Sequence, residues 1–126
     1  MSPHLQIYRL PLTAILSISH RISGALLALG FVLGNLLLAA AATKAPIFEN
    51  VTEWLTQPLG RFLVAGWLLL FNYHLVHGIR HLLWDLGLGF SRSKQTLWGI
   101  TEITSALILT TLMVFAPCWL KSGSPL

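Results

Sequence analysis

Three long apolar stretches, separated by short polar segments, dominate the sequence. They cover residues 13–42, 61–86 and 102–120, and each is close to or above the roughly 20 residues that a helix needs to cross a bilayer. The connection at 43–60 is rich in acidic residues and proline, with one short interfacial helix expected near 49–55, and the connection at 86–99 is rich in glycine, serine and basic residues. Residues 1–12 hold two prolines and are predicted to form an irregular arm. The pattern therefore predicts an all-α integral membrane protein with three transmembrane helices in a single domain of residues 1–126.

Composition supports this class and excludes several others. Hydrophobic residues make up 55% of the chain and charged residues only 10%, against a usual charged share of about 25% in soluble proteins. The only cysteine is Cys118, so the sequence has no internal disulfide, no cysteine cluster for an iron–sulfur centre and no Cys-x-x-Cys-His site for covalent haem. We find no dinucleotide-binding fingerprint and no nucleic-acid signature.

Basic residues near the ends of the predicted spans indicate the orientation. The richer side is expected to face the bacterial cytoplasm or the mitochondrial matrix, which places the N terminus on that side and the C terminus outside. The basic residues of the inner side are Arg9, Arg21, Arg80, Arg92 and Lys94, and those of the outer side are Lys44, Arg61 and Lys121.

The second apolar stretch contains polar side chains that a bilayer disfavours. At 100° per residue, His74 and His81 lie within about 20° of each other on the helix surface, and His77 lies about 60° from His74. His74 is roughly 20 Å along the helix from Arg61 and roughly 16 Å from Asp85, which puts it near the bilayer midplane. An imidazole at that depth suits a haem iron or another metal, a structural polar contact between helices, or a proton path. The residues alone leave these three interpretations open.

The first stretch begins with a polar stripe. Ser17, His20, Arg21 and Gly24 recur at i, i+3, i+4 and i+7, so they share one helix face at the inner side of the membrane. A hydroxyl and a guanidinium one turn apart can donate hydrogen bonds to the carbonyl oxygens of a quinone head group, and the cation can stabilise charge that develops there. Equally, an arginine at this level can extend toward the interface and mark the positive side of the membrane.

Three motifs carry a resemblance to a known family. They are Ser2-Pro-His-Leu-Gln-Ile-Tyr8, then Leu10-Pro-Leu-Thr-Ala-Ile-Leu-Ser17-Ile-Ser-His20-Arg21-Ile-Ser-Gly24, and then His74-Leu-Val-His77-Gly-Ile-Arg80-His81-Leu-Leu-Trp-Asp85-Leu-Gly87. In this order they closely resemble the large cytochrome b anchor subunits of succinate dehydrogenase, respiratory complex II.

The resemblance implies roles for individual residues. Ser17 and Arg21 would help to form the ubiquinone pocket, and His74 would be an axial ligand of the haem b iron. His20, Arg21 and His81 would approach the haem propionates. His77 stands where the family does not usually have histidine, so it is assigned nothing beyond a polar contact.

The resemblance also implies an assembly. The chain would form half of a heterodimeric haem-binding helix bundle, in which a small membrane-anchor subunit supplies the second haem ligand. Electrons from succinate would arrive through a flavoprotein subunit and an iron–sulfur subunit, so this chain would be part of an enzyme without being catalytic alone. Two alternatives remain: an anchor of quinol:fumarate reductase, and a non-redox membrane subunit that serves as a proton relay or in assembly.

Overall fold

The computed structural model describes residues 11–88 and 92–123. These residues form four α-helices: α1 (Leu12–Ala42), α2 (Pro46–Thr56), α3 (Pro58–Asp85) and α4 (Gln95–Ser122), with a short 3-10 helix η2 (Arg92–Lys94) before α4. No strand occurs within the described ranges. The predicted N-terminal arm, with its Ser-Pro-His motif and Arg9, lies outside the described residues up to position 10.

Three of the helices are long and apolar enough to cross a membrane. These candidate spans are Ala14–Ala42, Pro58–Asp85 and Gln95–Ser122, with mean hydropathies of 2.2, 1.5 and 1.9. A 28-residue helix is about 42 Å long at 1.5 Å per residue, which exceeds the roughly 30 Å of the hydrocarbon core. The prediction of an all-α membrane protein with three spanning helices is confirmed.

Two helix starts differ from the sequence pattern. α3 begins at Pro58 rather than 61, because a proline is well suited to the first turn of a helix, where its missing N–H costs nothing. α4 begins at Gln95, seven residues before the predicted start at 102, so the expected loop ends earlier than 99. Gly99 belongs to the helix, where a Cβ would lie 2.9 Å from Cδ1 of Leu16, so the glycine allows α1 and α4 to approach closely. Glu102 consequently lies about two turns inside α4 instead of at its start.

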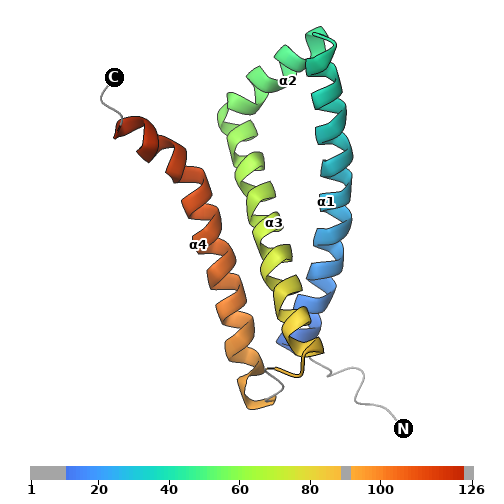
Figure 1. The fold of residues 1–126 in the computed structure, drawn as a ribbon, viewed down its shortest axis with the longest axis vertical. Coiled ribbons are helices and arrows are strands. Elements are labelled where there is room, and N and C mark those ends of the chain that lie inside the picture. Colours follow the sequence, from blue (N-terminus) through green and yellow to red (C-terminus); the bar gives the residue numbers. More distant parts are fainter. Residues whose placement is uncertain (1–10, 89–91, 124–126) are drawn as a thin grey trace.

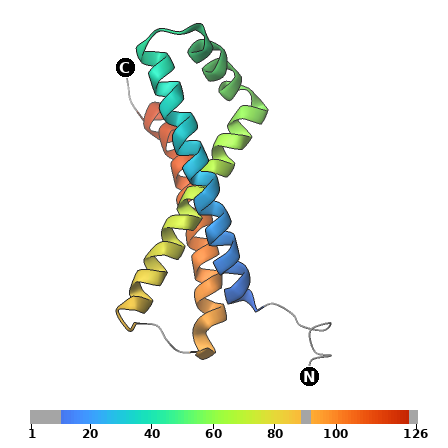
Figure 2. The same ribbon diagram turned by 90° about the vertical axis from the view of Figure 1, so that its right-hand side faces the viewer.

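α3 is the central helix of the bundle. It packs against α1 on one side and α4 on another, while α2 joins α1 to α3 at one end (Figure 1). Seen from the side, α1 and α3 cross (Figure 2). Because the chain runs along the bundle three times, the first turn of α1 and the last turn of α4 lie at opposite ends of the molecule (Figure 1).

The burial pattern is the reverse of that in a soluble protein. The largest fully buried side chains are those of His77, Asn72 and Ser23, whereas Phe31 and Trp119 are 74% and 80% exposed. Buried polar side chains join helices, as where Nδ2 of Asn72 donates to Oγ1 of Thr110 at 3.0 Å. An apolar surface around a polar interior is the arrangement that lipid as a solvent favours, because polar groups must find partners inside the bundle.

Candidate functional site

Four histidines from α1 and α3 form one cluster. His20 of α1 lies among three histidines of α3, with ring centroids 4.0 Å from His74, 4.4 Å from His77 and 6.0 Å from His81. The rings of His77 and His81 are 4.8 Å apart. The structure thus brings together the histidine face predicted on α3 and the one histidine of the polar stripe on α1. His81 is exposed at the edge of the cluster, and its ring meets Trp84 edge-on at 5.3 Å.

His74 is held by a serine that the sequence reasoning did not single out. Ser23 is 1% exposed, and its Oγ lies 2.9 Å from Nδ1 of His74 and 2.7 Å from the carbonyl oxygen of His20. The signal for this residue was present, because Ser23 stands one helical turn after His20 and next to Gly24. The pattern of one helix, however, does not show which residue of another helix Ser23 would contact.

An open apolar groove of about 640 Å³ runs beside His74 between α1 and α3. Its walls include Leu27, Phe71 and Trp67. Gly24 clears the edge of the imidazole, since a Cβ there would lie 2.9 Å from Cε1 of His74, and a Cβ at Gly30 would overlap the indole of Trp67. The groove can therefore accept a flat apolar group against the His74 ring.

A buried ion-pair network joins α3 to α4. Glu102, 2% exposed, accepts a hydrogen bond from Nδ1 of His77 at Oε1 and another from Nη1 of Arg80 at Oε2, the latter at 2.5 Å. The guanidinium of Arg80 also stacks over the Trp84 ring, 4.3 Å from its centroid. Arg80 is only 6% exposed, so it is paired inside the bundle and does not extend toward the interface.

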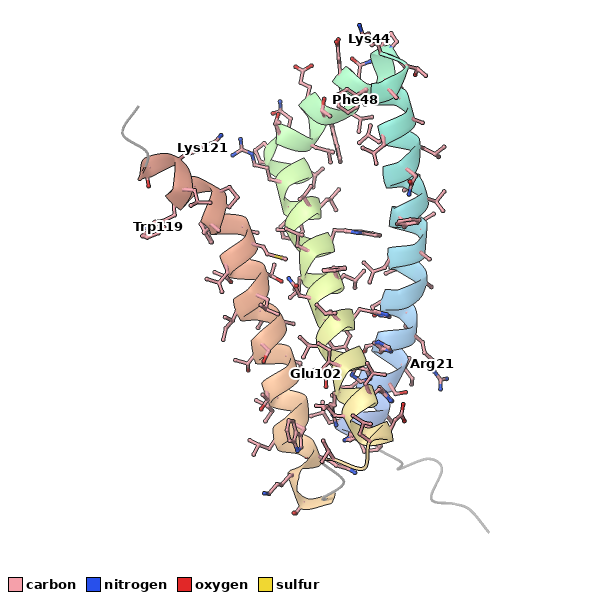
Figure 3. The ribbon with its side chains drawn as sticks, in the orientation of Figure 1. Arg21, Lys44, Phe48, Glu102, Trp119 and Lys121 are labelled. Carbon is pink, nitrogen blue, oxygen red and sulfur yellow. The ribbon has the colours of Figure 1, made fainter. Side chains whose placement is uncertain are left out.

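Sequence reasoning missed this network because it took residue 102 as the start of the third span, at the edge of the membrane, and could not identify partners on another helix. The available signal was the spacing of small and polar residues on α4, which marks an interior helix face in membranes. That face is formed by Gly99, Glu102, Ala106 and Thr110, the buried residues of α4. Glu102, about two turns into α4, lies where this helix approaches α3 (Figure 3).

Ser17 and Arg21 take no part in the hydrogen bonds and ring contacts of the histidine cluster among the described residues. Arg21 is exposed and projects from α1 on the side away from α3 and α4 (Figure 3), and Ser17 is half-buried. Within the described ranges, neither side chain forms a hydrogen bond or an ion pair. Their donors are thus available to another molecule, and Arg21 and Arg80, predicted at the same membrane level, face different surroundings.

Some buried nitrogen atoms of the cluster have no hydrogen-bond partner among the described residues. They include Nε2 of His20 and Nε2 of His77. A buried polar group without a partner is costly, so a hydrogen-bond partner beside these rings would be stabilising. For Nε2 of a neutral His77 that partner is a donor, because Nδ1 already carries the proton that it donates to Glu102. No three or more histidine, cysteine, aspartate or glutamate side chains in the described part of the chain are arranged to hold a metal ion.

Comparison with known proteins identifies the family of the chain. The family model for succinate dehydrogenase/fumarate reductase transmembrane subunits matches residues 1–120. The chain is 39% identical to the succinate dehydrogenase cytochrome b556 subunit of Paracoccus denitrificans, over 91% of this chain and 92% of that protein. It is 37% identical to the cytochrome b560 subunit of Marchantia polymorpha, over 99% and 95%, and 33% identical to the cytochrome b556 subunit of Rickettsia felis, over 89% and 87%. The chain belongs to the family of succinate dehydrogenase/fumarate reductase transmembrane subunits.

Proposed function

We propose that this chain is the cytochrome b membrane anchor of a succinate dehydrogenase, with haem b bound at His74 and a ubiquinone site at Ser17 and Arg21. The observation that carries the proposal is the apolar groove between α1 and α3, which has His74 in its wall and Gly24 at the edge of the ring. When bound, haem b supplies a centre that accepts and returns single electrons. A small anchor subunit on the open side of this groove would provide the second iron ligand.

The polar end of the cluster suits the haem propionates. Nε2 of His20 is buried without a described partner and can donate to a carboxylate, and His81 stands next to it at the exposed edge. A charge-assisted hydrogen bond of this kind is among the stronger polar contacts in proteins. Because Arg21 projects away from the cluster, its geometry favours the quinone role over the predicted propionate contact.

The quinone site would use the two free donors on α1. Ser17 and Arg21 are one turn apart on the same helix face, so a hydroxyl and a guanidinium can both reach one carbonyl oxygen of the head group. Reduction of a quinone places negative charge on these oxygens before protons arrive, and a fixed cation stabilises that charge. Arg21 stands nine residues after the start of α1, the end that we place on the inner side of the membrane, so the protons would come from the water on that side.

The rest of the enzyme would lie in other subunits. Oxidation of succinate needs a flavoprotein and an iron–sulfur subunit, for which this sequence has neither a nucleotide fingerprint nor a cysteine cluster. We place the start of α1 on the cytoplasmic or matrix side, with Lys44 and Lys121 at the opposite end (Figure 3). The catalytic subunits would dock at the inner end, near Arg21.

An optical difference spectrum of the assembled complex, reduced with dithionite minus oxidised, tests the haem assignment. We expect a b-type band that is lost in His74→Ala, because the iron loses a ligand from this chain. A complex without the band, or a His74→Ala complex that keeps it unchanged, would overturn the assignment.

The alternative function is a proton relay, which the buried His77–Glu102 contact would support. The absence of any b-type band in the wild-type complex would favour this alternative. The direction of catalysis is a separate question, since the matched family includes fumarate reductases. Rates of succinate oxidation and fumarate reduction by the same purified complex distinguish the two enzymes.

A further inference from the structure

We propose that Ser23 selects the tautomer of His74, so that Nδ1 carries the proton and Nε2 keeps its lone pair for the iron. This inference depends on the proposed haem function and adds a positioning residue to it. Ser23 would touch neither the iron nor the porphyrin and would act through the imidazole.

The hydrogen-bond geometry around Ser23 gives the direction of each bond. A hydroxyl group has one proton to donate and two lone pairs to accept with. The carbonyl oxygen of His20, 2.7 Å away, is only an acceptor, so the hydroxyl proton must point to it. The Ser23 oxygen can then only accept from the ring, 2.9 Å away, which requires a proton on Nδ1 of His74. A neutral imidazole with Nδ1 protonated leaves Nε2 as its single free ligand atom.

The surroundings of Ser23 keep this arrangement in place. The serine is 1% exposed, so water does not compete for either bond. The ring of His20 stacks on the ring of His74, with centroids 4.0 Å apart and planes 13° from parallel. One turn of α1 therefore supplies a stacking ring, a hydrogen-bond acceptor and, at Gly24, the clearance for the imidazole.

The nature of the partner also affects the bound iron. The second ring nitrogen of a metal-binding histidine almost always donates to an outer partner, which fixes the ring orientation and sets its basicity. A neutral hydroxyl accepts the ring proton less strongly than a carboxylate would, so the main effect of Ser23 would be on the orientation of the ring. Loss of such an outer partner typically lowers metal affinity about 10- to 100-fold.

Two isosteric variants isolate the hydroxyl from the shape of the side chain. Ser23→Thr keeps the hydroxyl, and Ser23→Val replaces it with a methyl group in the same branched outline. We expect Ser23→Val, like Ser23→Ala, to release haem about 10- to 100-fold more readily from the purified complex. The low-spin ferric signal in electron paramagnetic resonance should broaden or shift in both, because the ring loses its orientation. Ser23→Thr should behave as the wild type does.

Ser105→Ala provides the matched control, since that serine hydroxyl bonds the Thr101 carbonyl on its own helix in a spanning segment. Equal haem retention and an unchanged resonance signal in Ser23→Val and Ser23→Thr would overturn the inference. The variant His74→Ala distinguishes a failure of the proposed haem site from a failure of the proposed role of Ser23. If it loses haem while Ser23→Val retains it, the haem site stands and the role of Ser23 falls, whereas a wild-type complex without haem removes the proposed function itself.

Discussion

Replacement of Glu102 by alanine tests the ion-pair network between α3 and α4 most directly. The carboxylate accepts from both His77 and Arg80, and all three side chains are at most 6% exposed. Without it, the Arg80 guanidinium remains charged and buried against the Trp84 ring, with no other carboxylate paired to it among the described residues. We expect Glu102→Ala to lower the free energy of unfolding of the complex through this uncompensated charge, more than through the loss of contacts.

The magnitude follows from the position of Arg80. Breaking a buried ion pair by removing one partner costs about 3–5 kcal/mol. Arg80 is five residues from the end of α3 at Asp85, about 7.5 Å along the axis, so its long side chain can move part of the way to the interface. We therefore expect Glu102→Ala to lower the free energy of unfolding by about 3 kcal/mol, the lower end of that range. An ordinary interhelical hydrogen bond in a membrane averages about 0.6 kcal/mol. An uncompensated charge should therefore lower the free energy of unfolding several-fold more than the loss of such a bond would.

Unfolding of the detergent-solubilised complex in mixed micelles with dodecyl sulfate, followed by circular dichroism, measures this difference. Thr104→Ala is the control, because its hydroxyl bonds the Ile100 carbonyl on the exposed face of the same helix. In the double variant Arg80→Leu with Glu102→Leu no charge is left unpaired, so most of the lost stability should return. A cost for Glu102→Ala no larger than for Thr104→Ala, or a double variant that is merely additive, would refute the reasoning.

Two further predictions concern the proposed cofactor and quinone sites. Arg21→Ala should slow ubiquinone reduction about 10- to 100-fold, the equivalent of a charged hydrogen bond of about 1.5–3 kcal/mol, and Ser17→Ala should slow it less. Electron transfer from succinate to an artificial acceptor should be unchanged in both, and unaltered quinone kinetics would remove the assignment. Gly24→Ala should reduce the haem content of the complex, because its Cβ would lie 2.9 Å from Cε1 of His74. Gly66→Ala, whose Cβ would meet nothing within 4 Å in the described structure, should leave the haem content as it is.

The sequence predicts those features that a single helix determines. The three spans follow from hydropathy, and the common face of His74 and His81 follows from the 3.6-residue period. The contact of His20 with the histidines of α3 could be expected only from the family resemblance, because this contact depends on how α1 is rotated against α3.

Contacts between helices are what the pattern could not supply. The pattern predicts a third span that begins at residue 102, whereas α4 begins at Gln95 and Glu102 lies about two turns inside it. The cost of burying its carboxylate is offset by two donors from α3, which the pattern could not identify. Ser23 went unnoticed because its hydroxyl acquires significance only beside His74. In each case the missing information was the identity of a partner on another helix.

Some polar residues of α3 contact α4 and others contact α1, and His77 contacts both helices. At 100° per residue, Asn72 and Arg80 fall within about 80° of each other and bond residues of α4, while His74 and His81 lie about 20° apart and contact the histidine of α1. His77 lies between these two groups, and it bonds the carboxylate of α4 while its ring is 4.4 Å from the histidine of α1. Because lipid is as apolar as the side chains, the hydrophobic effect does little to distinguish helix faces, so polar contacts help close packing to fix the rotation of α3. One imidazole that contacts both neighbours therefore ties the position of α4 to the geometry of the proposed haem site.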